Sequence, residues 1–73
     1  MSSHYRMQLN NIVAQQRRAL TYREVATGPK HDPLWTVAVY VNMVEFGRAV
    51  GKNLNATKEE AARQALALIS QGY

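Results

Sequence analysis

Residues 34–41 constrain the fold of this chain more than any other stretch, because their side chains alternate strictly between two faces. One face carries Trp35, Val37, Val39 and Val41, and the other carries Thr36, Ala38 and Tyr40. A repeat of period two is the pattern of a half-buried antiparallel strand. A strand is therefore predicted over residues 34–41, with the large side chain of Trp35 in the core.

Two further strands are predicted next to this one. Asn42-Met43 fits a two-residue hairpin turn, although less well than Asn-Gly because methionine resists a positive φ. Residues 44–50 then return as a strand. Before the alternating segment, Tyr22 and Val25 indicate a strand over residues 20–26. The centre of the chain is thus predicted to be a three-stranded antiparallel sheet.

Helical patterns flank the strands on both sides. In residues 3–18 the apolar side chains recur at i, i+4, i+7 and i+8, the spacing of one buried helical face, and they are Tyr5, Leu9, Ile12 and Val13. After a polar loop at residues 51–56, Thr57 and Glu60 have the spacing of a capping box. A second helix is therefore predicted over residues 58–71, with small alanines on its inner face.

The order helix, three strands, helix predicts an α+β fold in which two helices pack on one face of the sheet. The chain of 73 residues is expected to form one domain over residues 5–71, after a tail at residues 1–4. It has no cysteine, so packing must hold the fold together. Neither a signal-peptide pattern nor an apolar run of ~18 residues is present, which predicts an intracellular protein, cytoplasmic or nuclear, with no membrane contact.

Charge and side-chain chemistry narrow the function. The formal net charge is +4, and six of the nine basic residues are arginines, which suits a polyanionic partner but is also an ordinary surplus for solubility. His4 and His31 are the only histidines, and without a thiolate they form no metal-ligand set. No serine is placed as a nucleophile. The sequence predicts a binding module, not an enzyme, with no cofactor and no small-molecule substrate.

Five short motifs, in this order, resemble the double-stranded RNA-binding domain, and they look closest to small fungal members of that family. They are Leu9-Asn10-Asn11, Leu20-Thr21-Tyr22, Gly28-Pro29-Lys30-His31, Trp35 at the head of a strand, and Lys58 with Ala61 and Ala65. The most specific is Gly-Pro-x-His, in a loop that glycine and proline make rigid. The resemblance covers about residues 5–70 and implies binding of double-stranded RNA.

The resemblance also implies three contact regions on one side of the molecule. The first helix lies in one minor groove, the Gly-Pro-x-His loop enters the next, and the start of the last helix meets the phosphates between them. The candidate RNA-binding residues are Asn11, Gln15 and Arg18 on the first helix, Pro29, Lys30 and His31 in the loop, and Lys52, Lys58 and Arg63 around the last helix.

The chain departs from the family pattern at two of these regions. Where the family has Lys-Lys-x-Ala-Lys, this chain has Lys58-Glu59-Glu60-Ala61-Ala62, and Ala14 stands where glutamine is usual. Each phosphate contact adds about −0.9 to the salt slope, so the loss of two lysines predicts modest affinity. Both glutamates are also expected to meet the positive end of the last helix.

Each candidate residue has a structural alternative. The outer face of the first helix is otherwise a solvated surface, and His31 otherwise hydrogen-bonds within its own loop. Arg63 is either a replacement phosphate contact or the partner of Glu59 in an i, i+4 ion pair, which is slightly favoured. The alternative function is a domain of the same fold that has exchanged RNA for protein, as a homodimer or with another partner.

Overall fold

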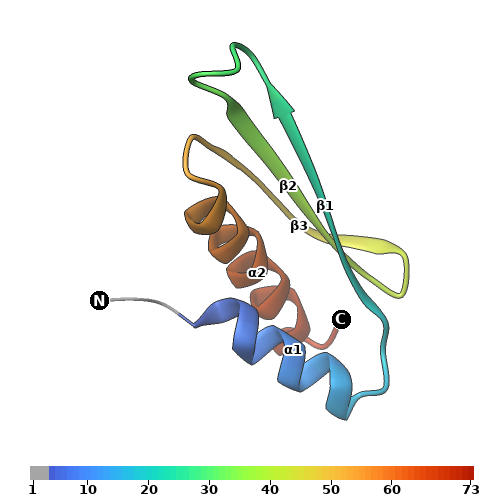
Figure 1. Cartoon of the computed structure of the whole chain (residues 1–73). Coiled ribbons are helices and arrows are strands. Elements are labelled where there is room, and N and C mark those ends of the chain that lie inside the picture. The colour runs from blue at the N-terminus through green and yellow to red at the C-terminus, as the bar shows by residue number, and fades with distance from the viewer. Residues whose placement is uncertain (1–3) are drawn as a thin grey trace.

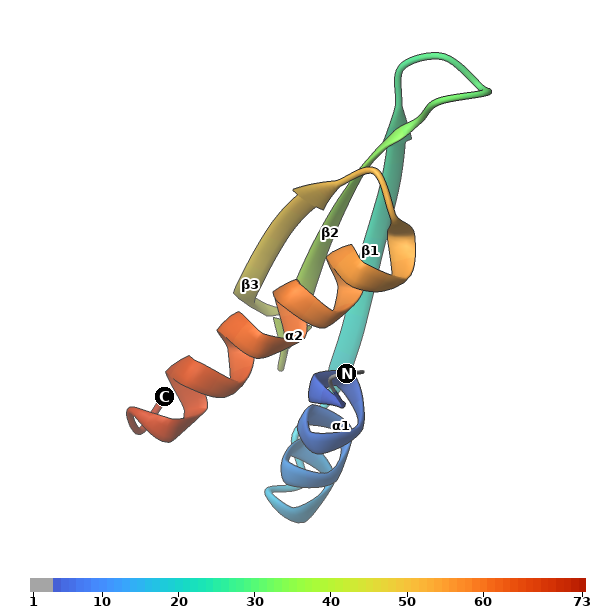
Figure 2. The same ribbon diagram turned by 90° about the vertical axis from the view of Figure 1, so that its left-hand side faces the viewer.

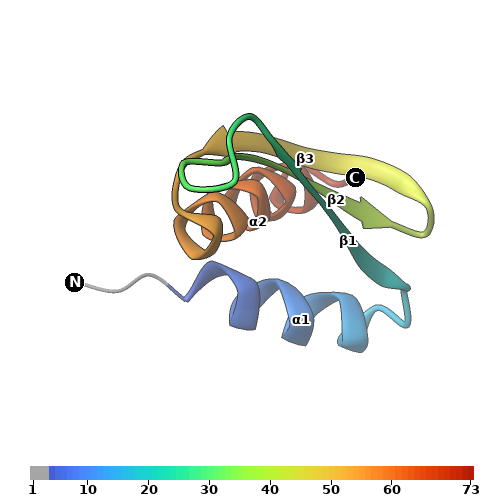
Figure 3. The same ribbon diagram turned by 45° about the horizontal axis from the view of Figure 1, so that its top comes forward.

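The computed structural model describes residues 4–73. It contains α1 (Tyr5–Gln15), β1 (Leu20–Thr27), β2 (Leu34–Val41), β3 (Val44–Gly51) and α2 (Leu54–Ser70), shown in Figure 1. The strands form one antiparallel sheet in the order β1-β2-β3. In Figure 2 α2 lies across one face of the sheet, and Figure 3 shows α1 on that same side, beside α2. The predicted α+β architecture is confirmed.

The central strand β2 has the bounds that its alternating pattern predicts. Val37, Val39 and Val41 are almost completely buried on its helix-facing side. The hairpin turn that follows is confirmed, because Asn42 and Met43 have φ values of 50° and 68°, as a type I′ turn requires. Close to this turn, the pairing of β2 with β3 shifts in register between Val39 and Tyr40, as at a β-bulge. The strands β1 and β3 each run one residue further than predicted.

Trp35 is only half-buried, so the prediction that it lies in the core is wrong. It has the same parity along β2 as the buried valines, but it lies near the start of the strand, where it pairs with Gly51. That end of the sheet lies where α2 begins (Figure 1), so Trp35 stands at the margin of the helix layer. The alternating pattern predicts on which face of the sheet Trp35 lies, but not how far the helices extend over that face.

Small residues allow α2 to approach the sheet closely. Ala61 and Ala65 of α2 are completely buried, and Gly47 of β3 lies directly under the helix. A Cβ atom built on Gly47 would overlap the backbone carbonyl oxygen of Ala61. Leu9 of α1 completes the core with no exposed surface. This close contact fixes where the first turns of α2, and the charged side chains on them, stand relative to the sheet.

The helix α1 ends three residues earlier than predicted, and its predicted start at residue 3 lies outside the described residues. Arg17 has a φ of 57°, and the amides of Arg17 and Arg18 donate to the carbonyls of Ala14 and Val13 at 3.1 and 2.9 Å. This is a Schellman motif, which normally has glycine at the left-handed position. Arg18 therefore lies beyond the helix rather than on its outer face.

The helix α2 begins one turn earlier than predicted, and the predicted capping box is wrong. Asn53 is the N-cap, and its side-chain oxygen accepts a hydrogen bond from the amide of Ala56 at 3.0 Å. Thr57 lies inside the helix, where its buried hydroxyl donates to the carbonyl of Asn53 at 2.7 Å. Glu60 is consequently too far along the helix to act at its positive end.

Candidate nucleic-acid interface

The three segments with candidate RNA contacts lie along one side of the molecule. Figure 2 shows the loop between β1 and β2 at the top, the start of α2 below it and α1 at the bottom. The molecule is 39 Å long in its longest dimension. A single extended partner can therefore meet all three segments at once.

The loop at residues 28–33 is shaped by its own backbone. Gly28 has a φ of 88°, a conformation that favours glycine, and the carbonyl of Pro29 accepts from the amide of Asp32 at 3.1 Å. Pro29, Lys30 and His31 are all exposed. Within residues 4–73, neither Lys30 nor His31 makes an ion pair. The loop thus presents a basic tip whose side chains are free to reach a ligand.

Lys52 lies in the turn between β3 and α2 and reaches the same loop. Its Nζ atom is 3.5 Å from Oδ2 of Asp32, and both side chains are more than half exposed. An exposed pair of this kind contributes about 0–1 kcal/mol, so water and salt compete with it readily. The pair brings the loop and the start of α2 together but leaves Lys52 available to a phosphate.

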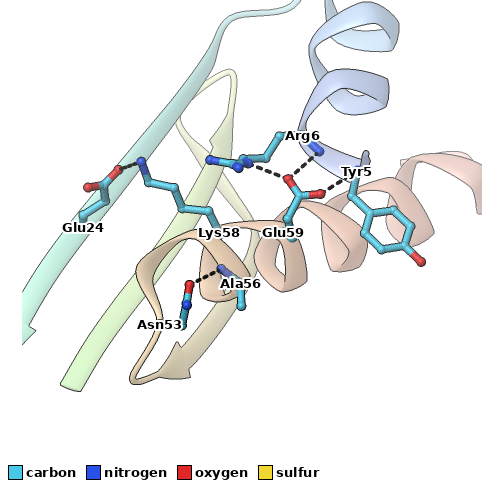
Figure 4. Close-up of polar contacts among 7 residues, drawn as sticks. All are labelled: Tyr5, Arg6, Glu24, Asn53, Ala56, Lys58 and Glu59. Carbon is cyan, nitrogen blue, oxygen red and sulfur yellow. Dashed lines mark hydrogen bonds and ion pairs between the residues drawn. The ribbon is translucent and has the colours of Figure 1, made fainter. Parts of the chain in front are cut away.

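Lys58 is held by a carboxylate on the neighbouring strand. Its Nζ atom lies 2.7 Å from Oε2 of Glu24 in β1, and only 22% of its side chain is exposed (Figure 4). The Glu24 side chain is 33% exposed. The lysine that the family resemblance assigns to the phosphates is therefore already in an ion pair.

Glu59 joins the two helices. Its carboxylate accepts from the backbone amide of Tyr5 at 2.8 Å and from Nε of Arg6 at 2.5 Å, with a longer contact to the Arg6 amide (Figure 4). These amides are in the first turn of α1, where helix donors otherwise lack partners. Glu59 thus acts as an N-terminal cap supplied by another helix. Its expected role at the positive end of its own helix is wrong.

Arg63 pairs with Glu60, not with Glu59 as favoured from the sequence. Its guanidinium contacts both carboxylate oxygens of Glu60, at 2.6 and 2.8 Å. About half of each side chain is exposed. The i, i+3 pair replaces the predicted i, i+4 pair because Glu59 is turned toward α1. Arg63 lies on the exposed surface of α2 with its charge largely neutralised.

Sequence reasoning did not assign a functional role to the four side chains that lie around Lys58. A cleft of about 200 Å³ between α1, β1 and α2 is lined by Arg6, Asn10, Tyr22, Glu24 and Lys58. Arg6 and Asn10 are four residues apart on α1, so helical spacing alone could have grouped them. Glu24 joins them only through the fold. Of the predicted contacts on α1, Asn11 and Gln15 are exposed and neither lines this cleft.

The contact between Glu59 and the first turn of α1 predicts that the fold becomes less stable at acidic pH. Burial alone would raise the pKa of this carboxyl, but hydrogen bonds from Arg6 and Tyr5 outweigh it and lower the pKa below its ordinary value of 4.5. A lowered pKa in the folded state stabilises the fold above the unfolded-state pKa, and this contribution is lost as pH falls through the folded-state pKa. We expect the melting temperature of the wild type to fall more steeply below about pH 4.5 than that of Glu59→Gln.

Circular dichroism melts over a pH series will measure this difference. Glu60→Gln is the matched control, because it removes a carboxylate one position along whose partner is an exposed arginine. We expect Glu60→Gln to keep most of the acid sensitivity. Equal slopes for the wild type and Glu59→Gln would contradict the assignment.

Residues 4–73 contain no group of three histidine, cysteine, aspartate or glutamate side chains placed to hold a metal ion. In the same part of the chain, no helix has the length and apolar character needed to cross a membrane.

Relatives of the chain are found among curated proteins. It is 41% identical over 58 residues to ribonuclease 3 of Corynebacterium efficiens and 36% identical over 58 residues to ribonuclease 3 of Corynebacterium glutamicum. Each alignment covers 78% of this chain but only 24% of the relative, so the chain spans about a quarter of the length of these proteins. Both relatives are bacterial, and the expected closeness to fungal members is not supported.

The fold and the family follow from two further matches. The solved structure of Arabidopsis HYL1 has a TM-score of 0.84, with 22% sequence identity over 93% of this chain and 99% of that one. At this identity the likeness concerns the fold. Residues 5–69 match the family described as the double-stranded RNA binding motif, and this range includes all three candidate contact regions. This chain belongs to the double-stranded RNA binding motif family.

Proposed function

We propose that this chain binds double-stranded RNA by its A-form shape, with little sequence preference. One observation carries the proposal. In this member of the family, α1, the exposed Gly28-Pro29-Lys30-His31 loop and the start of α2 lie along one side of the molecule. A-form RNA hides its base edges in a deep major groove and displays 2′-hydroxyls in a shallow minor groove. Recognition therefore depends on hydrogen bonds to sugars and on the spacing of the grooves.

The three segments have different roles in this proposal. Asn11 and Gln15 on α1 offer amide donors and acceptors to one minor groove, and His31 with the carbonyls of the loop does the same in the next. Lys58 meets the phosphates between them. Lys30 and Lys52 add positive charge near the loop. Binding, rather than catalysis, is the role assigned to these residues.

Modest affinity follows from the ion pairs on this surface. Lys52, Lys58 and Arg63 each pair with a carboxylate of the same molecule. A cation that must leave a carboxylate to reach a phosphate gains less free energy than one that leaves water. The loop carries a larger share of recognition here than a full lysine cluster would require of it.

His31→Ala is expected to weaken binding to duplex RNA by about 2–10-fold, the loss of one hydrogen bond of about 0.5–1.5 kcal/mol. The measurement is fluorescence anisotropy with duplex RNA of about 20 base pairs, since such modules span roughly 16. Thermal stability should not change, because His31 is exposed. Gln71→Ala, in the exposed turn after α2, is the control and should bind as the wild type does.

Duplex DNA and single-stranded RNA of the same length complete the titration. Affinity for duplex DNA equal to that for duplex RNA would overturn recognition by shape. A large fall in the melting temperature of His31→Ala would instead show that His31 has a structural role within its loop.

Self-association through the sheet is the second candidate function. β3 is an edge strand, and Val44 and Val50 on it are each 58% exposed, which suits pairing with a second copy of this chain. Sedimentation over a concentration series tests it. A concentration-dependent dimer together with no binding to duplex RNA would favour this candidate.

A further inference from the structure

We propose that Glu24 is an internal competitor for RNA at Lys58 and sets the affinity of the module. This inference rests on the proposed binding of double-stranded RNA. The pair Glu24–Lys58 joins β1 to the first turns of α2 (Figure 4). The start of α2 lies between the other two segments of the candidate surface (Figure 2). Glu24 would hold Lys58 whenever no phosphate does.

The position of Glu24 explains why it reaches Lys58. It pairs with Val37 of β2, and cross-strand partners point to the same face of a sheet. Val37 is completely buried on the helix-facing side, so Glu24 is a charged residue on that side too. It lies on the edge strand β1, and its carboxylate turns to the nearest ammonium group, 2.7 Å away.

The charges around Lys58 sum to zero. Arg6 and Lys58 supply two positive charges, and Glu24 and Glu59 neutralise both, with side chains that are 16–37% exposed. An approaching phosphate therefore meets a neutral surface at the place where the family relies on lysines. Neutralising Glu24 removes the carboxylate that pairs with Lys58 and gives this surface a net positive charge.

Salt dependence distinguishes this competition from a general change in charge. In the wild type, Lys58 releases an RNA counterion when it meets a phosphate, but Glu24 then takes up a cation. In Glu24→Gln the uptake disappears, so the salt slope becomes steeper by up to about 0.9. We expect Glu24→Gln to bind duplex RNA about two- to five-fold more tightly at low salt, which is the range for a partly exposed ion pair.

The control must change the net charge equally without touching Lys58. Glu45→Gln does so, because Glu45 pairs with Arg48 on β3 at 2.6 Å and both side chains are about half exposed. We expect Glu45→Gln to bind as the wild type does. Glu24→Thr is a second variant that suits a strand and should reproduce the gain if glutamine disturbs β1.

A double-mutant cycle assigns the gain to Lys58. Lys58→Ala should cost more affinity in the Glu24→Gln background than in the wild type, and Glu24→Gln should give no gain once Lys58 is absent. The inference is overturned if Glu24→Gln and Glu24→Thr bind as the wild type does, if Glu45→Gln gains as much, or if the gain persists without Lys58.

The wild-type titration keeps this test separate from that of the proposed function. If the wild type binds duplex RNA and the Glu24 variants do not differ from it, only the competitor is lost. If the wild type does not bind but Glu24→Gln does, the competitor is supported as the cause. If neither binds duplex RNA, both proposals fail.

Discussion

Replacing Glu59 by lysine is expected to destabilise the protein by about 2–4 kcal/mol, although it restores a residue of the family pattern. The carboxylate accepts hydrogen bonds from the amide of Tyr5 and the guanidinium of Arg6, and its side chain is only 16% exposed. Hydrogen bonds to charged groups contribute about 1.5–3 kcal/mol each, and lysine can accept none of them. The first turn of α1 would lose its cap.

Repulsion adds to this loss. A lysine at position 59 would place its ammonium group close to the Arg6 guanidinium and to the positive end of α1. For a domain of this size, each 1 kcal/mol lowers the melting temperature by about 4–8 °C. We therefore expect Glu59→Lys to melt at least about 8 °C below the wild type.

Glu60→Lys is the matched control for this prediction. It makes the same change in charge at the next residue, where the ion pair with Arg63 is about half exposed and contributes about 0–1 kcal/mol. Thermal and urea denaturation followed by circular dichroism will compare the two variants. Equal stability of Glu59→Lys and Glu60→Lys would show that the contact with α1 does not hold the helices together.

The contrast between positions 59 and 60 marks the limit of sequence reasoning on this chain. The order of the elements, the bounds of β2 and the Asn42-Met43 turn were predictable because each depends on neighbouring residues. The partners of Lys58 and Glu59 were not, since they lie 34 and more than 50 residues away along the chain. A motif places a side chain on an element but does not identify what faces it.

Helix ends were misplaced for a local reason. Two residue types suited to the N-cap stand four positions apart, Asn53 and Thr57, and the Thr-x-x-Glu pattern favoured the wrong one. At the end of α1, Arg17 takes the left-handed position where glycine would have marked the stop. By contrast, Gly72 occupies the equivalent position after α2, and that helix ends within one residue of the prediction.

Gly47→Ala is expected to destabilise the protein by about 1–3 kcal/mol, at the upper end of this range for overpacking. The new methyl group would overlap the carbonyl oxygen of Ala61 and lie 3.2 Å from Cβ of Gln64. The carbonyl belongs to the helix backbone, so no rotamer change relieves the overlap, and α2 must move away from β3. Urea denaturation at 25 °C measures the cost, with Val50→Ala as the control on the same strand, where the side chain is 58% exposed.

Movement of α2 should also be visible at the candidate RNA surface. Lys58 and Glu59 lie on α2 within one turn of Ala61, so a shift of the helix carries both away from their partners on β1 and α1. In NMR spectra of Gly47→Ala, the amide signals of Tyr5 and Arg6 should move, because Glu59 contacts both amides. Unchanged stability and unchanged signals would mean that β3 yields instead of α2, and that the close packing at Gly47 does not position the charged residues at the start of the helix.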